Sequence, residues 1–152
     1  MRRSFPFRTL TSVSLAGFLA AAALSAQEPS ALGRWKTVDD RTNQVRSIVH
    51  IEETNGELRG KVEKIFAPPA KESNPLCEKC PGDLRNKPVV GMQIIWGLKK
   101  AGNEYTGGRV MDPEDGKIYR CKLRLVAGGK KLELRGYIGF SLLGRTQTWI
   151  RD

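Results

Sequence analysis

Hydrophobic and polar residues alternate at period two along several segments of the chain, most clearly between Glu104 and Leu125. The second half of that stretch sets Tyr119, Cys121, Leu123 and Leu125 on one face against Arg120, Lys122 and Arg124 on the other. Such alternation is typical of an antiparallel strand with one buried and one solvated face. Residues 112–117, Asp-Pro-Glu-Asp-Gly-Lys, contain the proline and glycine of a tight reversal, so the whole stretch predicts a β-hairpin.

The same alternation recurs on both sides of this hairpin and predicts eight short strands in all. The other expected strands cover 33–37, 44–53, 57–66, 91–98, 131–139 and 145–152. The residues expected to share one face of these strands are Val45, Val49 and Ile51; Leu58, Gly60 and Val62; Met92, Ile94, Trp96 and Leu98; Leu132, Leu134 and Ile138; and Gln147, Trp149 and Arg151. Asn55-Gly56 is a strong hairpin signal, and consecutive hairpins favour a meander that closes to hide its edges. The sequence therefore predicts an all-β, eight-stranded, up-and-down antiparallel barrel.

The first 26 residues break this pattern and have the form of a secretory signal peptide. Arg2, Arg3 and Arg8 precede an apolar run over 13–24, and small residues precede Gln27. The alternative is an uncleaved anchor, but the run is shorter than the about 20 residues that a membrane-spanning helix needs. We therefore expect a signal peptide at 1–26 and a single β-barrel domain at 27–152, with no membrane-spanning segment in it.

The chain is basic, with a formal net charge of +10. Cleavage removes three arginines and leaves about +7, which favours anionic partners such as phospholipid head groups. The basic residues are interleaved with acids along the strands, which indicates a solvated positive surface and no nucleic-acid-binding groove. An exported protein also seldom meets nucleic acid.

Five prolines interrupt residues 67–88 and exclude a regular strand or helix there. This loop contains Cys77-x-x-Cys80, for which a structural disulfide is the favoured interpretation in an oxidising compartment. A redox-active pair would normally open a helix, and zinc would need further ligands from Cys121 and His50, which are expected far away. We expect no metal and no cofactor, and Cys121 is left as a buried apolar side chain.

Several motifs occur together in one order along most of 27–152. They are Gly33-x-Trp35, Asn74-Pro75-x-Cys77-x-x-Cys80, Lys87-Pro88-x-x-Gly91, Asp112-Pro113-x-x-Gly116-Lys117-x-Tyr119, Arg135-Gly136-Tyr137-Ile138-Gly139 and Gly144-Arg145-x-Gln147-x-Trp149-x-Arg151. The ensemble resembles an exported Gram-negative family known as a domain of unknown function, number twenty-one forty-seven. Gly33-x-Trp35 with Arg151 is also similar to the lipocalin and calycin signature. The resemblance implies a small periplasmic barrel in which Trp35 closes one end and Arg151 packs across it; it implies no catalytic residues.

These observations favour a non-enzymatic periplasmic protein that binds or carries a small apolar or amphipathic molecule inside the barrel. Candidate ligand-binding residues are Trp96, Tyr105, Arg109 and Tyr119, and structural candidates are Gly33, Trp35, Trp149 and Arg151. Arg109 shares the parity of Tyr105, so an inward Arg109 would suit an anionic head group unless a bulge at Gly107-Gly108 re-aims it. The alternative is an envelope interaction protein with a filled barrel that contacts lipid or protein through its basic surface or the 67–88 loop.

Overall fold

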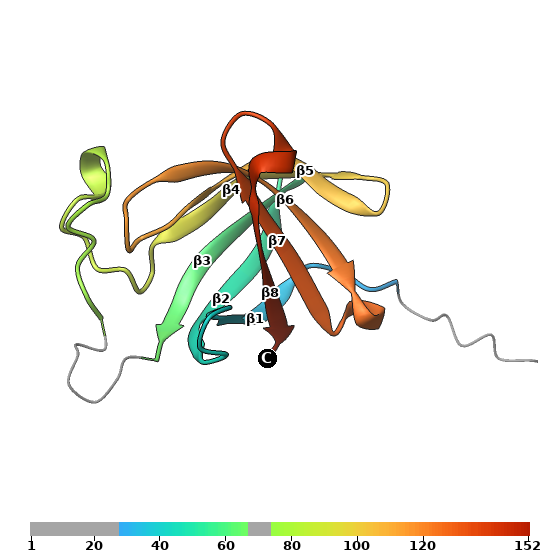
Figure 1. Ribbon diagram of the computed structural model, residues 1–152, viewed down its shortest axis with the longest axis horizontal. Coiled ribbons are helices and arrows are strands. Elements are labelled where there is room, and N and C mark those ends of the chain that lie inside the picture. Colours follow the sequence, from blue (N-terminus) through green and yellow to red (C-terminus); the bar gives the residue numbers. More distant parts are fainter. Residues whose placement is uncertain (1–27, 67–73) are drawn as a thin grey trace, which may run out of the picture.

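The eight strands form one closed antiparallel barrel in a computed structural model that describes residues 28–66 and 74–152 (Figure 1). The strands are β1 (Gly33–Val38), β2 (Val45–Thr54), β3 (Glu57–Ile65), β4 (Gln93–Ala101), β5 (Glu104–Met111), β6 (Ile118–Val126), β7 (Lys131–Tyr137) and β8 (Arg145–Arg151). Short 3₁₀ turns η1 (Gly82–Leu84), η2 (Ala127–Gly129) and η3 (Ser141–Leu143) lie in the connections. The up-and-down barrel is thus confirmed, whereas the expected signal peptide lies outside the described residues.

Each strand pairs with its neighbours in the sequence, and the barrel closes where β1 pairs with β8. The closing pairs are Trp35 with Arg151 and Lys36 with Ile150. Because every hairpin reverses the chain, connections alternate between two ends of the barrel. One end carries the β2–β3, β4–β5 and β6–β7 turns, and the other carries the β1–β2, β3–β4, β5–β6 and β7–β8 connections. We call the second group the open end.

Trp35 and Arg151 seal the opposite end, which we call the closed end. The Trp35 ring is fully buried, its Nε1 donates to the carbonyl of Ala31 at 2.8 Å, and the Arg151 guanidinium carbon lies 4.2 Å from the ring centroid. Arg151 also donates to the carbonyls of Gly129 and Ser30, at 2.9 and 2.6 Å. This is the arrangement that the lipocalin resemblance implies, and it ties the first strand, the last strand and the β6–β7 turn together.

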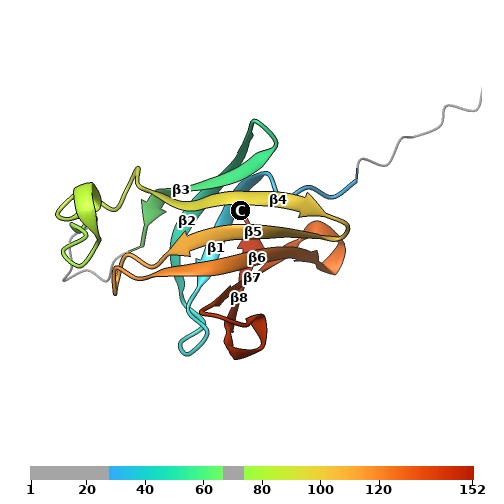
Figure 2. The ribbon, with the colours of Figure 1, turned by 90° about the horizontal axis from the view of Figure 1, so that it is seen from above.

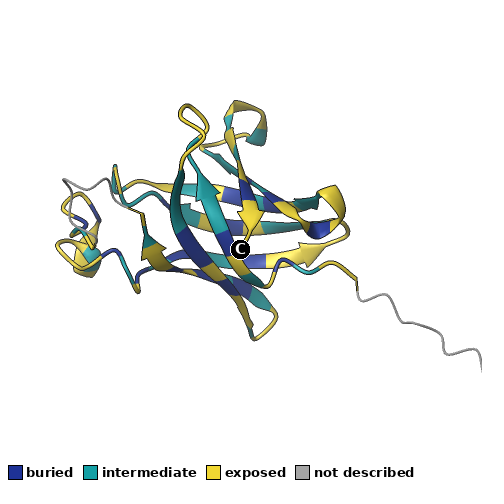
Figure 3. Ribbon diagram, turned by 90° about the horizontal axis from the view of Figure 1, so that it is seen from below, coloured by how far each residue is buried: buried dark blue, intermediate teal, exposed yellow. Residues whose placement is uncertain are grey.

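Buried residues, most of them on the strands of the barrel, form one apolar core (Figure 3). The fully buried members include Val49, Ile51, Ile95, Leu98, Leu123 and Leu132. The alternation predicted for residues 119–125 is present, since Cys121 and Leu123 are fully buried while Arg120 and Arg124 are exposed. The apolar face of the hairpin is therefore the inner wall of the barrel.

Two glycine bulges reverse the parity of β4 and β5 at the same level. Gly97 and Gly107 take φ of +67° and +77°, and the register between β5 and β6 shifts between Tyr105 and Gly108. Beyond the bulges Ile95 pairs with Val110 on the inner face, and Trp96 pairs with Arg109 on the outer face. The expectation that Trp96 shares a face with Leu98 is therefore wrong. For Arg109, the structure has the expected alternative, a bulge at Gly107-Gly108 that turns this side chain away from the inner face.

The predicted inward position of Ile138 is also wrong. Pairing between β7 and β8 ends at Gly136 and Arg145, and the backbone then leaves the barrel wall. Ile138 consequently lies in the β7–β8 connection with 68% of its surface exposed.

Cys121 is expected to be chemically silent in the folded protein. It is a buried free cysteine, and burial raises the pKa of its thiol from about 9 to about 12. Because only the thiolate reacts, a disulfide-exchange reagent at pH 8 should modify Cys121 after unfolding but not before. The raised pKa also makes the free energy of unfolding depend on pH. Because the thiol ionises at lower pH in the unfolded chain than in the folded protein, Cys121 lowers the stability of the fold as pH rises from about 9 to 12. Rapid labelling of the native protein would contradict this burial.

Candidate functional site

The open end of the barrel contains a cavity of about 420 Å³. Its apolar lining comes from β4, β5, β7 and β8, namely Ile94, Val110, Met111, Leu134 and Trp149. Gly136 leaves room on β7, because it contributes no side chain opposite Val110 and Tyr119. The interior is thus filled near the closed end and hollow near the open end.

Hydrogen-bonding groups occur on the same walls, closer to the rim. Thr37 and Ser47 are joined through their hydroxyls at 2.7 Å, and Tyr119 donates its hydroxyl to Asp115 Oδ2 at 2.8 Å. Trp149 Nε1 donates to Gln147 Oε1 at 3.3 Å. The bond to Asp115 raises the pKa of Tyr119, so Tyr119 is a neutral hydroxyl at physiological pH. The cavity therefore combines an apolar floor with neutral polar groups above it.

Charged residues border the rim in opposed pairs. Arg46 meets Glu114 at 2.7 Å, and Arg145 Nε meets Asp40 Oδ2 at 3.0 Å, which ties the β1–β2 turn to β8. The Arg145 hydrogen bond lowers the pKa of Asp40. Asp112 differs, because burial raises the pKa of its carboxyl group, whose Oδ1 accepts the backbone N–H of Glu114 at 2.9 Å. A polar group on a ligand would find both signs of charge at this rim.

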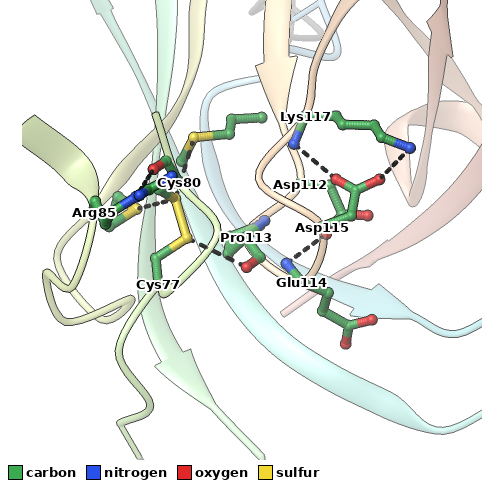
Figure 4. The surroundings of a disulfide bond; sticks show 10 residues. Cys77, Cys80, Arg85, Asp112, Pro113, Glu114, Asp115 and Lys117 are labelled. Atoms are coloured by element: carbon green, nitrogen blue, oxygen red, sulfur yellow. Dashed lines mark hydrogen bonds and ion pairs between the residues drawn. A yellow bond between two sulfur atoms is a disulfide. The ribbon is translucent and has the colours of Figure 1, made fainter. Parts of the chain in front are cut away.

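The described part of the long β3–β4 connection, residues 74–92, folds against the open end and is braced by the predicted Cys77–Cys80 disulfide (Figure 4). Both sulfurs are fully buried, and Cys80 Sγ lies 3.5 Å from Met111 Sδ and 4.0 Å from Met92 Sδ. Cys77 Sγ lies 3.3 Å from the carbonyl oxygen of Pro113. The disulfide thus packs on the β5–β6 turn beside the cavity wall, which makes it a structural brace.

A second hollow of about 700 Å³ lies between this connection and the barrel. Its lining includes apolar residues of β3 and of the long connection, such as Ile65, Phe66, Leu76 and Val89. Both hollows are lined by Arg46 and Glu114. The ion pair of those two residues therefore stands between the cavity and the outer hollow.

The structure separates the candidate residues from one another. Tyr119 lines the cavity, as does Trp149, which the sequence assigned a structural role. Tyr105 packs against the core opposite Leu123, away from the cavity lining. Trp96 and Arg109 lie on the outer face.

Sequence reasoning missed much of the rim. Thr37 and Ser47 line the cavity but were not proposed as site residues. A signal was available in the sequence, because by alternation Thr37 shares the inner face of Trp35, and Ser47 that of Val49. Asp112 was interpreted as a turn residue, and Arg145 was noted only as part of a family motif at the start of the last expected strand.

Two absences hold for residues 28–66 and 74–152. Within them, no group of three His, Cys, Asp or Glu side chains converges as a metal ion would require. None of the helical turns within them is long and apolar enough to cross a membrane.

A closed eight-stranded barrel, sealed by a tryptophan and an arginine at one end and hollow at the other, defines a lipocalin-like protein. A similar solved structure is that of protein HP1028 from Helicobacter pylori, described as belonging to the lipocalin family. The TM-score is 0.68 at 25% identity, over 81% of this chain and 83% of that one. The family model of uncharacterized proteins conserved in bacteria, DUF2147, matches residues 33–151, and the chain belongs to that family. A search of curated proteins found no match.

Proposed function

We propose that this chain is an exported, periplasmic and non-enzymatic protein that binds a small amphipathic molecule in the open-end cavity. The observation that carries the proposal is the cavity itself. At about 420 Å³ it falls within the roughly 300–1,000 Å³ of ordinary small-molecule sites. Its apolar floor suits a hydrocarbon or ring, and its rim suits a polar end group.

The groups around the cavity support binding rather than catalysis. Tyr119 is held neutral by Asp115, and the two rim arginines pair with Glu114 and Asp40. A catalytic acid or base needs a pKa near the working pH and a partner aimed at the reacting atom. The arrangement here instead offers fixed hydrogen-bonding groups over an apolar surface.

Native mass spectrometry of the protein purified after export tests this proposal. We expect added mass that leaves on denaturation, and a polypeptide mass that begins at Gln27. A bare protein that gains no mass from a panel of fatty acids, phospholipids and isoprenoids would contradict binding. A polypeptide that retains residues 1–26 would contradict the signal peptide without touching the cavity.

Gly136→Leu should block the cavity. A Cβ at Gly136 would make only ordinary contacts, 3.6 Å from Tyr119 Cβ and 3.7 Å from Val110 Cγ1, so the leucine enters the cavity without displacing the backbone. We expect the affinity for the bound molecule to fall about tenfold or more, because the leucine takes up volume that the ligand needs.

Thr148→Leu is the matched control, since Thr148 lies exposed on β8 opposite Glu133. Isothermal titration with the ligand found by mass spectrometry compares the two variants. Equal affinity of the Gly136→Leu variant and the unaltered protein would place the ligand elsewhere.

A further inference from the structure

The β7–β8 connection, residues 138–144, carries four strongly exposed apolar side chains. Ile138, Phe140, Leu142 and Leu143 expose 68, 80, 89 and 81% of their surfaces. Every other exposed large apolar residue in the described part of the chain exposes 51% or less. Single exposed apolar residues are ordinary, but a contiguous set is typical of an interaction surface. We call these four residues the apolar loop.

The apolar loop is held in place from beneath. Arg135 donates from Nε to the carbonyl of Ser141 at 2.6 Å and from Nη2 to the carbonyl of Leu142 at 3.1 Å. The N–H of Leu143 donates to the carbonyl of Phe140 at 3.1 Å. The backbone carbonyls at the tip therefore have partners within the protein. That matters because unsatisfied backbone groups make entry into an apolar medium costly.

The shape of the apolar loop favours a lipid surface as its partner. The β7–β8 connection stands out from the barrel wall at the top of Figure 1 and at the bottom of Figure 2. A projecting apolar tip suits insertion among lipid head groups.

The positive net charge of the protein indicates which lipid surface the loop would bind. The chain carries a net +10, or about +7 after the expected cleavage. Exposed Arg41 borders the rim beside the loop, whereas Arg145 is already paired with Asp40. Like charge opposes pairing with a second copy of the chain, whereas an anionic bilayer attracts it. Apolar insertion and electrostatic attraction then add, as they do for interfacial membrane anchors.

We infer that the apolar loop docks the open end of the barrel on a bilayer that contains anionic lipid. Ile138 and Leu143 line the cavity as well as the loop. A docked molecule therefore faces the lipids with its cavity mouth. Docking goes beyond ligand binding, since it needs only the loop and the charge.

Co-sedimentation with vesicles tests docking directly. The probes are vesicles of phosphatidylcholine with about one third phosphatidylglycerol, and vesicles of phosphatidylcholine alone. We expect the protein purified after export to partition onto the anionic vesicles and less onto the neutral ones. Phe140→Ser combined with Leu142→Ser should lower the anionic partition coefficient at least about tenfold, since each removes a large exposed apolar side chain that docking would bury in the bilayer.

Ile150→Thr is the matched control. It removes apolar surface from an exposed strand residue that pairs with Lys36 near the closed end, so it should leave the partition coefficient unchanged. Absence of binding by the unaltered protein, equal binding by the double variant, or equal binding to neutral vesicles would each overturn the inference. A dimer in velocity sedimentation that the double variant dissociates would assign the loop to a second copy.

An environment-sensitive fluorophore at Leu142→Cys gives a second readout. The free Cys121 is buried, and Cys77 and Cys80 are bonded to each other, so labelling is selective. We expect a blue shift on adding anionic vesicles, and none for the same label at Ile150→Cys. An unshifted Leu142→Cys label in sedimenting protein would show electrostatic adhesion without insertion and overturn the inference.

Discussion

Trp35→Ala is expected to destabilise the barrel by about 3–5 kcal/mol, the usual range for removing a buried tryptophan. The ring is fully buried, donates to the Ala31 carbonyl, and lies under the Arg151 guanidinium. Its loss leaves a large void at the point where β1 meets β8. Because Trp35 is fully buried, water does not replace the contacts that the ring made. Urea unfolding followed by far-ultraviolet circular dichroism measures the change.

Trp96→Ala supplies the control, because it removes the same side chain from a half-buried position on the outer face. Trp96 borders the core but is only partly buried, so we expect a smaller loss of about 1 kcal/mol, the typical effect of a single substitution. Similar losses for the two variants would mean that Trp35 does not close the barrel in the manner described.

Gly116→Ala is expected to cost about 2–4 kcal/mol, with contributions from backbone strain and from steric overlap. Gly116 has φ of +70°, and its hydrogen atoms face the backbone of the Cys77–Cys80 segment. An added Cβ would overlap the backbone carbonyl group of Lys79. Because backbone cannot rotate away as a side chain can, the long connection must lift off the β5–β6 turn.

Gly102→Ala separates the two contributions. Gly102 has a similar φ of +62°, but nothing lies within 4 Å of its added Cβ. Strain alone should cost about 1 kcal/mol there. Hydrogen exchange of the Cys77 and Asn86 amides should accelerate only in the Gly116→Ala variant. Equal stability losses and unchanged exchange in both variants would show that the contact with Lys79 is unimportant.

The barrel could be predicted because its signals are local. Each strand is indicated by its own alternation of apolar and polar residues. The turns at Asn55-Gly56 and at 112–117 indicate which strands are adjacent. The motifs at Trp35 and Arg151 then implied how the ends meet. The Cys77–Cys80 bond was predictable because the two cysteines are close in the sequence and the third, Cys121, was expected to be buried on a strand.

The failures arose where glycine allows two backbone paths. Gly97 and Gly107 adopt positive φ and re-aim Trp96 and Arg109, yet glycine at those positions is equally compatible with a regular strand. Parity beyond a bulge can be assigned only when the opposite strand is known. The prediction of the ligand-binding residues failed for the same reason at Trp96 and Arg109. Tyr119, which lies on a stretch of β6 without a bulge, is the candidate that lines the cavity.

The position of the cavity could not be predicted from the sequence. Whether an inward position is filled depends on the combined volume of side chains from non-adjacent strands, such as Leu134 and Val110. The same holds for the contact between Lys79 and Gly116, which joins segments with no shared local pattern.

The pairing of Trp35 with Arg151 has a consequence for the order in which the barrel assembles. Hairpins such as β2–β3 join near neighbours and form early, whereas β1 and β8 lie at opposite ends of the barrel sequence. Contacts between distant residues are slow to form, because the intervening chain must first be ordered. Until they form, β1 and β8 each present an unpaired edge that can recruit another chain. Closure of the ring is therefore the step at which correct folding and aggregation compete.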